Sequence, residues 1–164
     1  MDIFEYAMKM EQDGRDFYLE NAGKTEVPAF RKILTQLADD ELKHYNIFKA
    51  MKEGQKAEYK DSEQTTIIKT MKNVFDDLKA ENKQLAFEPE AMAIWKEAQD
   101  VEKKSEDFYR SKAKEVGDEK QAHILNRIAD EEHRHWVTMQ NVIQFLNRPN
   151  SWLEDAEWNH LEDY

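Results

Sequence analysis

The feature that most constrains how this chain can fold is an internal repeat with an offset of 91 residues (132 − 41). Each copy contains a Glu, then a Phe-Tyr pair, then a Glu-x-x-His segment, and the two copies align without a gap. The repeated residues are Glu11, Phe17, Tyr18, Glu41 and His44 in the first copy, and Glu102, Phe108, Tyr109, Glu132 and His135 in the second. A repeat of this kind indicates duplicated architecture. Because Glu and His are metal-ligand types, it also indicates a duplicated half-site.

Apolar stripes with helical spacing predict four long helices, at residues 2–22, 27–54, 88–116 and 118–147. Short loops join the first pair and the last pair, so each pair forms an antiparallel hairpin. The connection between the hairpins is long and contains a helix of its own. We expect that helix to begin near Asp61, because an acidic residue followed three positions later by a glutamine is a capping pattern.

These elements predict an all-α four-helix bundle with a long helical crossover, whose two hairpins pack about a pseudo-two-fold axis. Residues 1–149 are expected to form the bundle domain. Residues 150–164, rich in Trp, Glu and Asp, are expected to form a short C-terminal tail that docks on the bundle or binds a partner.

Composition agrees with one helical domain and excludes several functions. The 164 residues are 40% hydrophobic and 36% charged, with four Gly and three Pro. The absence of cysteine excludes disulfides, thiolate zinc sites and iron–sulfur ligation in this chain. A formal net charge of −11 argues against nucleic-acid binding, which needs clustered Lys and Arg. No apolar run approaches bilayer length and the first residues lack a signal-peptide pattern, so we expect a cytoplasmic protein without a membrane partner.

The repeated glutamates interrupt apolar stripes that otherwise face the bundle core. An unpaired carboxylate there would cost several kcal/mol or would have to stay protonated. Four such residues at equivalent positions require cations, and a Glu and a His three residues apart on a helix project to the same side. The predicted ligands of a two-metal centre are Glu11, Glu41, His44, Glu102, Glu132 and His135. Oxygen and imidazole ligands without thiolate suit iron, manganese or, less specifically, zinc.

Two tyrosines lie near the predicted ligands. Tyr18 and Tyr109 follow Glu11 and Glu102 by seven residues, or two helical turns along the same face. They could simply pack in the core. The functional interpretation is that each phenol hydrogen-bonds a ligand carboxylate.

Other acidic and histidine residues near the motifs have simpler interpretations. Asp40 and Glu131 could accept the outer N–H of a ligand histidine across the bundle, but we expect both to be exposed at the surface. His123 and His133 are expected to face solvent. Residues 157–160 repeat the Glu-x-x-His spacing in the tail, without a matching partner or an apolar stripe, and we do not expect them to bind metal.

On these residues the chain resembles the rubrerythrin branch of the ferritin-like superfamily, over residues 2–147. The resemblance implies two iron ions held by the six ligands, the family's tyrosine positions at Tyr18 and Tyr109, and a non-haem di-iron peroxidase that commonly forms dimers. It has two departures. Rubrerythrin proper carries a rubredoxin-type iron–cysteine domain, so this cysteine-free chain needs an external electron-donor protein. The family also has a further Glu one turn after the third glutamate, where this chain has Ser105.

The expected function is reduction of hydrogen peroxide, with dioxygen as a further substrate, by a homodimeric di-iron oxidoreductase. Two alternatives remain open. One is a ferroxidase or iron-handling protein, and the other is a non-enzymatic oxygen or peroxide sensor whose Trp-rich tail binds a partner. Iron loading beyond two ions per chain would indicate storage, and turnover with an added reductant would indicate an enzyme.

Overall fold

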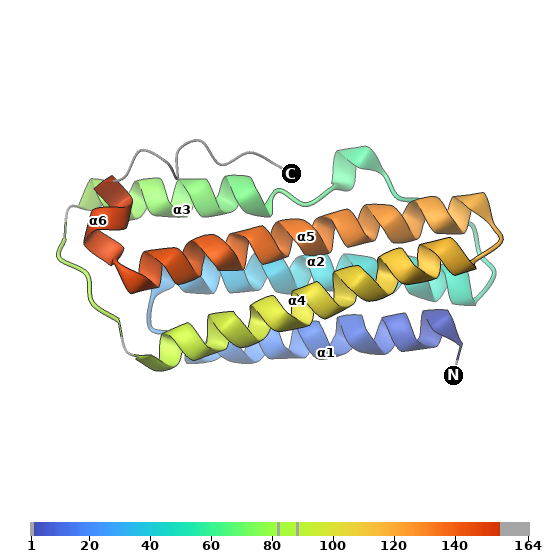
Figure 1. The fold of residues 1–164 in the computed structure, drawn as a ribbon, viewed down its shortest axis with the longest axis horizontal. Helices are drawn as coiled ribbons and strands as arrows, with labels where there is room; N and C mark the ends of the chain where they lie inside the picture. Colours follow the sequence, from blue (N-terminus) through green and yellow to red (C-terminus); the bar gives the residue numbers. More distant parts are fainter. Residues whose placement is uncertain (1, 82, 88, 155–164) are drawn as a thin grey trace.

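The computed structural model describes residues 2–81, 83–87 and 89–154, and in these ranges every regular element is a helix. Four long helices lie side by side in an elongated bundle (Figure 1). They are α1 (Ile3–Lys24), α2 (Pro28–Lys52), α4 (Pro89–Glu115) and α5 (Glu119–Asn147). The packing of α1 on α2 and of α4 on α5 forms the two predicted hairpins. The expected all-α bundle is therefore confirmed.

The helix ends follow from local chemistry. The Asp2 carboxylate accepts the backbone N–H groups of Phe4 and Glu5, each at 2.8 Å, and Asp118 caps α5 in the same way. Pro28 begins α2, where a missing N–H group costs nothing. After α2, Gly54 takes a left-handed φ of 71°, which lets the chain turn sharply out of the helix.

The crossover differs from the prediction at its start. Residues Asp61–Glu63 form a short 3-10 helix, and the crossover helix α3 begins only at Ile67 (Ile67–Glu81). The Asp61 carboxylate is 2.7 Å from the guanidinium of Arg127, so a partner on α5 takes the side chain expected to cap the helix. The hydroxyl of Thr65 instead accepts the backbone N–H of Ile67 at 3.2 Å.

The core at one end of the bundle joins the crossover and the tail to the long helices. There α3 packs on α2 and α5, and the short helix α6 (Pro149–Glu154) folds back beside them. The ring of Trp152 lies 4.7 Å from that of Phe75 and 5.9 Å from that of Phe145. The first part of the predicted tail is thus docked. Residues 157–160 lie outside the described residues.

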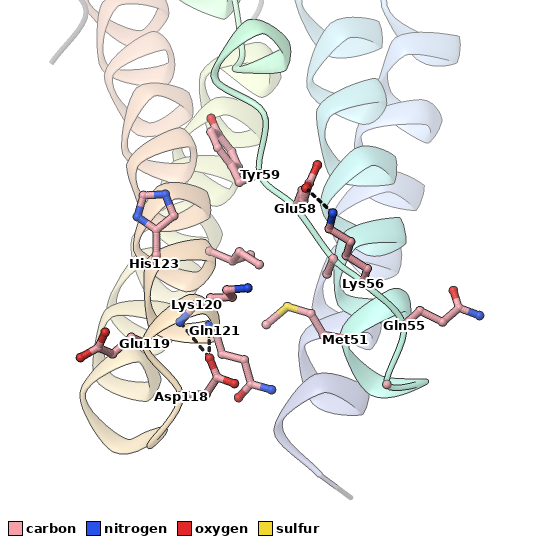
Figure 2. A pocket seen from close by; sticks show the side chains of 13 residues that line it. Met51, Gln55, Lys56, Glu58, Tyr59, Asp118, Glu119, Lys120, Gln121 and His123 are labelled. Carbon is pink, nitrogen blue, oxygen red and sulfur yellow. Dashed lines mark hydrogen bonds and ion pairs between the residues drawn. The ribbon is translucent and has the colours of Figure 1, made fainter.

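A surface pocket of about 690 Å³ lies at the other end, where the segment after α2 passes the start of α5 (Figure 2). Its lining includes Met51, Lys56, Tyr59, Asp118 and His123. His123 is exposed, as expected. None of the helices within the described ranges is both long enough and apolar enough to cross a membrane.

Candidate metal centre

The six predicted ligands meet at the middle of the bundle. Each of the four long helices supplies one of the glutamates, and α2 and α5 also supply one histidine each. All six side chains are at most 3% exposed. The arrangement follows from the repeat, because equivalent positions on the two hairpins face each other across the pseudo-two-fold axis.

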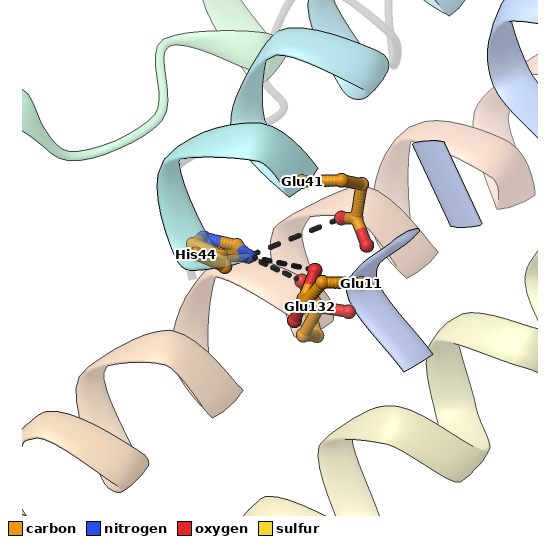
Figure 3. Close-up of side chains that lie close together, drawn as sticks. All are labelled: Glu11, Glu41, His44 and Glu132. Carbon is orange, nitrogen blue, oxygen red and sulfur yellow. Dashed lines mark ion pairs between the residues drawn. The ribbon is translucent and has the colours of Figure 1, made fainter. Parts of the chain in front are cut away.

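The ligand atoms fall into two overlapping groups, each contained within 4.8 Å. Glu11 and His44 belong to the first group, Glu102 and His135 to the second, and Glu41 and Glu132 to both. Figure 3 shows the first group, with the ring of His44 directed at three carboxylates. A carboxylate common to two groups is placed to bridge two metal ions.

Both histidines present the same ring nitrogen to the cluster. The Nδ1 atom of His44 is 3.1 Å from Glu132 Oε1 and 3.4 Å from Glu11 Oε2. The Nδ1 atom of His135 is 3.2 Å from an oxygen of Glu41 and 3.2 Å from an oxygen of Glu102. The candidate ligand atom is therefore Nδ1 in both halves, and Nε2 faces outwards.

The two tyrosines make the hydrogen bonds that their spacing suggested. The hydroxyl of Tyr109 donates to Glu11 Oε1 at 2.7 Å, and that of Tyr18 donates to Glu102 Oε1. Each bond joins a tyrosine of one hairpin to a carboxylate of the other. Burial, together with the neighbouring carboxylates, raises the pKa of both phenols well above the usual value, so both remain donors at neutral pH.

The expectation that Asp40 and Glu131 are exposed is wrong. Both are buried, and each accepts a hydrogen bond from the Nε2 atom of the histidine on the opposite hairpin. His135 Nε2 lies 2.9 Å from Asp40 Oδ2, and His44 Nε2 lies 3.1 Å from Glu131 Oε1. These contacts fix the ring orientation and leave Nδ1 free to face the cluster. The signal was the 91-residue offset between the two acidic residues (131 − 40), which places them at equivalent positions.

His133 also differs from the expectation that it faces solvent. It is half-buried, its ring stacks on Trp136 at 5.9 Å, and its Nδ1 atom lies 3.0 Å from Glu106 Oε1. The Nε–H group of Arg110 donates a hydrogen bond to the other oxygen of that carboxylate, Glu106 Oε2, at 3.0 Å. This network ties α4 to α5 outside the candidate metal centre.

The comparison with known families agrees with this geometry. A family model described as rubrerythrin matches residues 2–143. The chain belongs to the rubrerythrin family. No curated protein and no solved structure gives a significant match. Rubrerythrins are ferritin-like di-iron carboxylate proteins, and the bundle and the cluster of carboxylates and histidines accord with membership.

The centre of this rubrerythrin-family chain confines four carboxylates in the core, where their negative charges repel one another. Burial, and then the neighbouring carboxylates, raises the pKa of Glu41 and of Glu132 well above the usual value. Burial alone would raise the pKa of Glu11 and lower that of His44. Their mutual attraction, together with hydrogen bonds to neighbouring side chains, outweighs burial, so the pKa of Glu11 is lowered and that of His44 is raised. Four carboxylates and two imidazoles so confined favour the binding of cations or protons.

Unpaired buried atoms point to metal rather than to protons alone. Among the described residues, five ligand atoms are buried without a hydrogen-bond partner: Glu11 Oε2, Glu41 Oε1, His44 Nδ1, Glu102 Oε2 and Glu132 Oε1. Buried polar atoms are rarely left unpaired, and cations bound at the two ligand groups would give these atoms partners. The oxygen and nitrogen donor set fits iron and also fits manganese or zinc.

Gly14 lies beside Glu41, one of the two glutamates common to both ligand groups. A Cβ atom at Gly14 would lie 2.9 Å from Glu41 Oε2, so any side chain there would force that carboxylate to shift. The residue equivalent to Gly14 in the second copy is Ser105 (105 − 14 = 91), which is also buried. Both copies thus carry a small side chain there, and neither adds a carboxylate to the ligand set.

Proposed function

We propose that this rubrerythrin-family chain is a non-haem di-iron oxidoreductase that reduces hydrogen peroxide. The observation that carries the proposal is the pair of overlapping ligand groups that share Glu41 and Glu132. In the proposal Glu11 and His44 would hold one iron and Glu102 and His135 the other, with Glu41 and Glu132 available to both. When bound in the ferrous state, an iron pair would supply the two electrons that reduction of a peroxide O–O bond requires, each iron giving one.

The chain's own residues have three tasks in this proposal. The closed bundle excludes bulk water, since the ligand side chains are almost fully buried. Tyr18 and Tyr109 keep Glu102 and Glu11 in place by donating a hydrogen bond from the opposite hairpin. Asp40 and Glu131 hold the histidine rings so that Nδ1 faces the ions. We assign the two tyrosines to the reactive centre on this basis.

The proposal also includes the surroundings of the reaction. Because the chain contains no cysteine, it supplies no iron–cysteine site, and a separate electron-donor protein restores the reduced iron pair. The cysteine-free composition suits a reducing cytoplasm. A homodimer, as is common in the family, completes the proposal.

Stopped-flow absorbance of the di-ferrous protein, mixed separately with hydrogen peroxide and dioxygen, tests the proposed reaction. Peroxide should oxidise the protein faster. Glu102→Ala should largely abolish the reaction, whereas Glu115→Ala, an exposed change on the same helix, should leave it unchanged. Ser105→Glu should accelerate it, because a carboxylate offers a charged ligand where serine offers a weak neutral one. Faster oxidation by dioxygen would contradict the peroxidase assignment.

One observation favours a ferroxidase or iron-handling protein as the second candidate. The small residues Gly14 and Ser105 leave three carboxylates and one histidine in each ligand group, a nearly symmetric set. Faster reaction with dioxygen, together with iron loading beyond two ions per chain, would support this candidate.

A further inference from the structure

The two halves of the centre are nearly symmetric, but Glu131 and Asp40 have different additional partners. Glu131 Oε1, which holds His44, is also 2.9 Å from the ammonium group of Lys43. Asp40 Oδ2, which holds His135, instead accepts a hydrogen bond from the hydroxyl of Thr65. One orienting carboxylate therefore has a cationic partner and the other has a neutral one.

The repeat itself would have allowed equal partners. Lys43 and Arg134 are equivalent positions (134 − 43 = 91), and both side chains are basic. Within the described ranges, however, no ion pair joins Arg134 to Asp40. Thr65, which belongs to the connection between the hairpins, occupies the place beside Asp40. The crossover segment thus breaks a symmetry that the helices preserve.

This difference changes how strongly each histidine can bind a metal ion. A carboxylate that accepts the outer N–H of an imidazole increases the basicity of the nitrogen facing the metal. An ammonium group at 2.9 Å from the same carboxylate offsets much of its negative charge, and it adds a positive charge near the ion. The hydroxyl of Thr65 leaves the charge of Asp40 in place. This difference predicts that His135 is the stronger ligand and His44 the weaker one.

We propose that the two metal positions have unequal affinity, and that Lys43 sets the difference. The position formed by Glu102 and His135 fills first, and the position formed by Glu11 and His44 fills second. This inference rests on the proposed metal binding and specifies the order in which the centre is loaded.

Titration of the metal-free full chain with Co²⁺, followed by absorbance and calorimetry, measures the two binding steps. Repulsion between two divalent ions would make the second binding step weaker than the first even if the two positions were equivalent. The titration of the native chain alone therefore does not test the proposal, and the variants are needed. Asp40→Asn should weaken the first step several-fold, down to the affinity of the other position, because the position that fills first loses its orienting carboxylate. Glu131→Gln should leave the first step unchanged and weaken the second. If the positions were equivalent, either variant would lower the affinity of the first step by only about two-fold. This is the statistical factor for having one strong position instead of two.

Lys43→Met provides the direct test of the lysine. It should strengthen the second step several-fold and leave the first unchanged. Lys43→Arg retains the positive charge and should preserve the original separation of the steps, provided that circular dichroism shows the same fold. Lys9→Met, which removes an exposed lysine paired with Asp13, controls for the change in net charge.

The possible outcomes separate this inference from the proposed function. Complete absence of Co²⁺ binding would contradict the metal centre itself. Binding of two ions with identical effects of Asp40→Asn and Glu131→Gln would leave the centre intact and overturn the unequal affinities. A Lys43→Met variant that behaves like Lys9→Met would overturn the assigned role of Lys43.

Discussion

The middle of the bundle and the pocket at its end both gather charged side chains, but the two places hold them differently. In the pocket, Lys56 pairs with Glu58 at 3.3 Å in an exposed position, and the Asp118 carboxylate caps α5 (Figure 2). In the middle, three carboxylates surround the ring of His44 (Figure 3). The carboxylates of the centre are buried, and several of their oxygens have no hydrogen-bond partner. The charges of the pocket gain little from a ligand, since water already solvates them. The cluster of unpaired buried ligand atoms locates the candidate chemistry.

The largest expected difference between the two places comes from removing one carboxylate from each. Glu41→Ala removes a group common to both ligand sets, so it should weaken binding of both metal ions by at least about 100-fold. Glu58→Ala in the pocket should leave both affinities unchanged. Isothermal titration with Mn²⁺ or Co²⁺ measures both variants. Similar losses in the two variants would show that the comparison between centre and pocket is wrong.

Metal removal should destabilise the bundle, and the effect should depend on pH. The raised pKa values of Glu41, Glu132, His44 and His135 mean that the folded metal-free protein holds protons more tightly than the unfolded chain does. Such groups stabilise the fold below their unfolded pKa values, and this stabilisation is lost as the pH rises from about 5 into the alkaline range.

Bound metal replaces those protons, so the melting temperature gained on metal loading should grow with pH. At a free metal concentration of 100 times Kd, the stabilisation should be about 2.7 kcal/mol. Thermal melts of the metal-free and metal-loaded protein between pH 5 and 8 measure the difference. A gap that is constant with pH would argue against competition between protons and metal at these ligands.

Two glycine variants on α1 compare a methyl group added beside the metal centre with one added away from it. Gly14→Ala places a Cβ atom 2.9 Å from Glu41 Oε2, so the carboxylate must move, and metal affinity should fall by about 10-fold. Gly23→Ala meets nothing within 4 Å and should stabilise the helix by up to about 1 kcal/mol without affecting metal binding. Metal titration and thermal melts of both variants provide the check, and unchanged affinity in Gly14→Ala would contradict the tight fit.

The smallest expected effect concerns the tyrosines. Tyr109→Phe removes the hydrogen bond to Glu11, which should cost about 1.5–3 kcal/mol of interaction with the charged carboxylate. A bound metal also holds that carboxylate, so we expect only a modest loss of affinity, about several-fold. Tyr6→Phe, at a half-exposed position on α1, is the matched control. A Tyr109→Phe variant with unchanged metal affinity and oxidation rate would support simple core packing.

The helices and the ligand cluster were predictable from sequence because their signals are local or repeated. The caps at Asp2 and Asp118 lie beside the helices that they begin, and the 91-residue offset places Glu11 and Glu102 on equivalent faces. The burial of Asp40 and Glu131 was missed, because it depends on contacts between hairpins that a single helix does not reveal. The start of α3 was missed for a similar reason, since Arg127 on a distant helix takes the Asp61 carboxylate.

The docking of α6 bears on when the molecule can become complete during synthesis. Trp152 closes an aromatic cluster with Phe75 and Phe145, and Phe145 also lies near Phe30 at 6.3 Å. Among the described residues Trp152 is the most C-terminal ring of this cluster, so the rings of α2, α3 and α5 lack this neighbour until residue 152 has left the ribosome. Until then the growing chain exposes this apolar surface, which makes the nascent protein a candidate for chaperone binding although the finished bundle is compact.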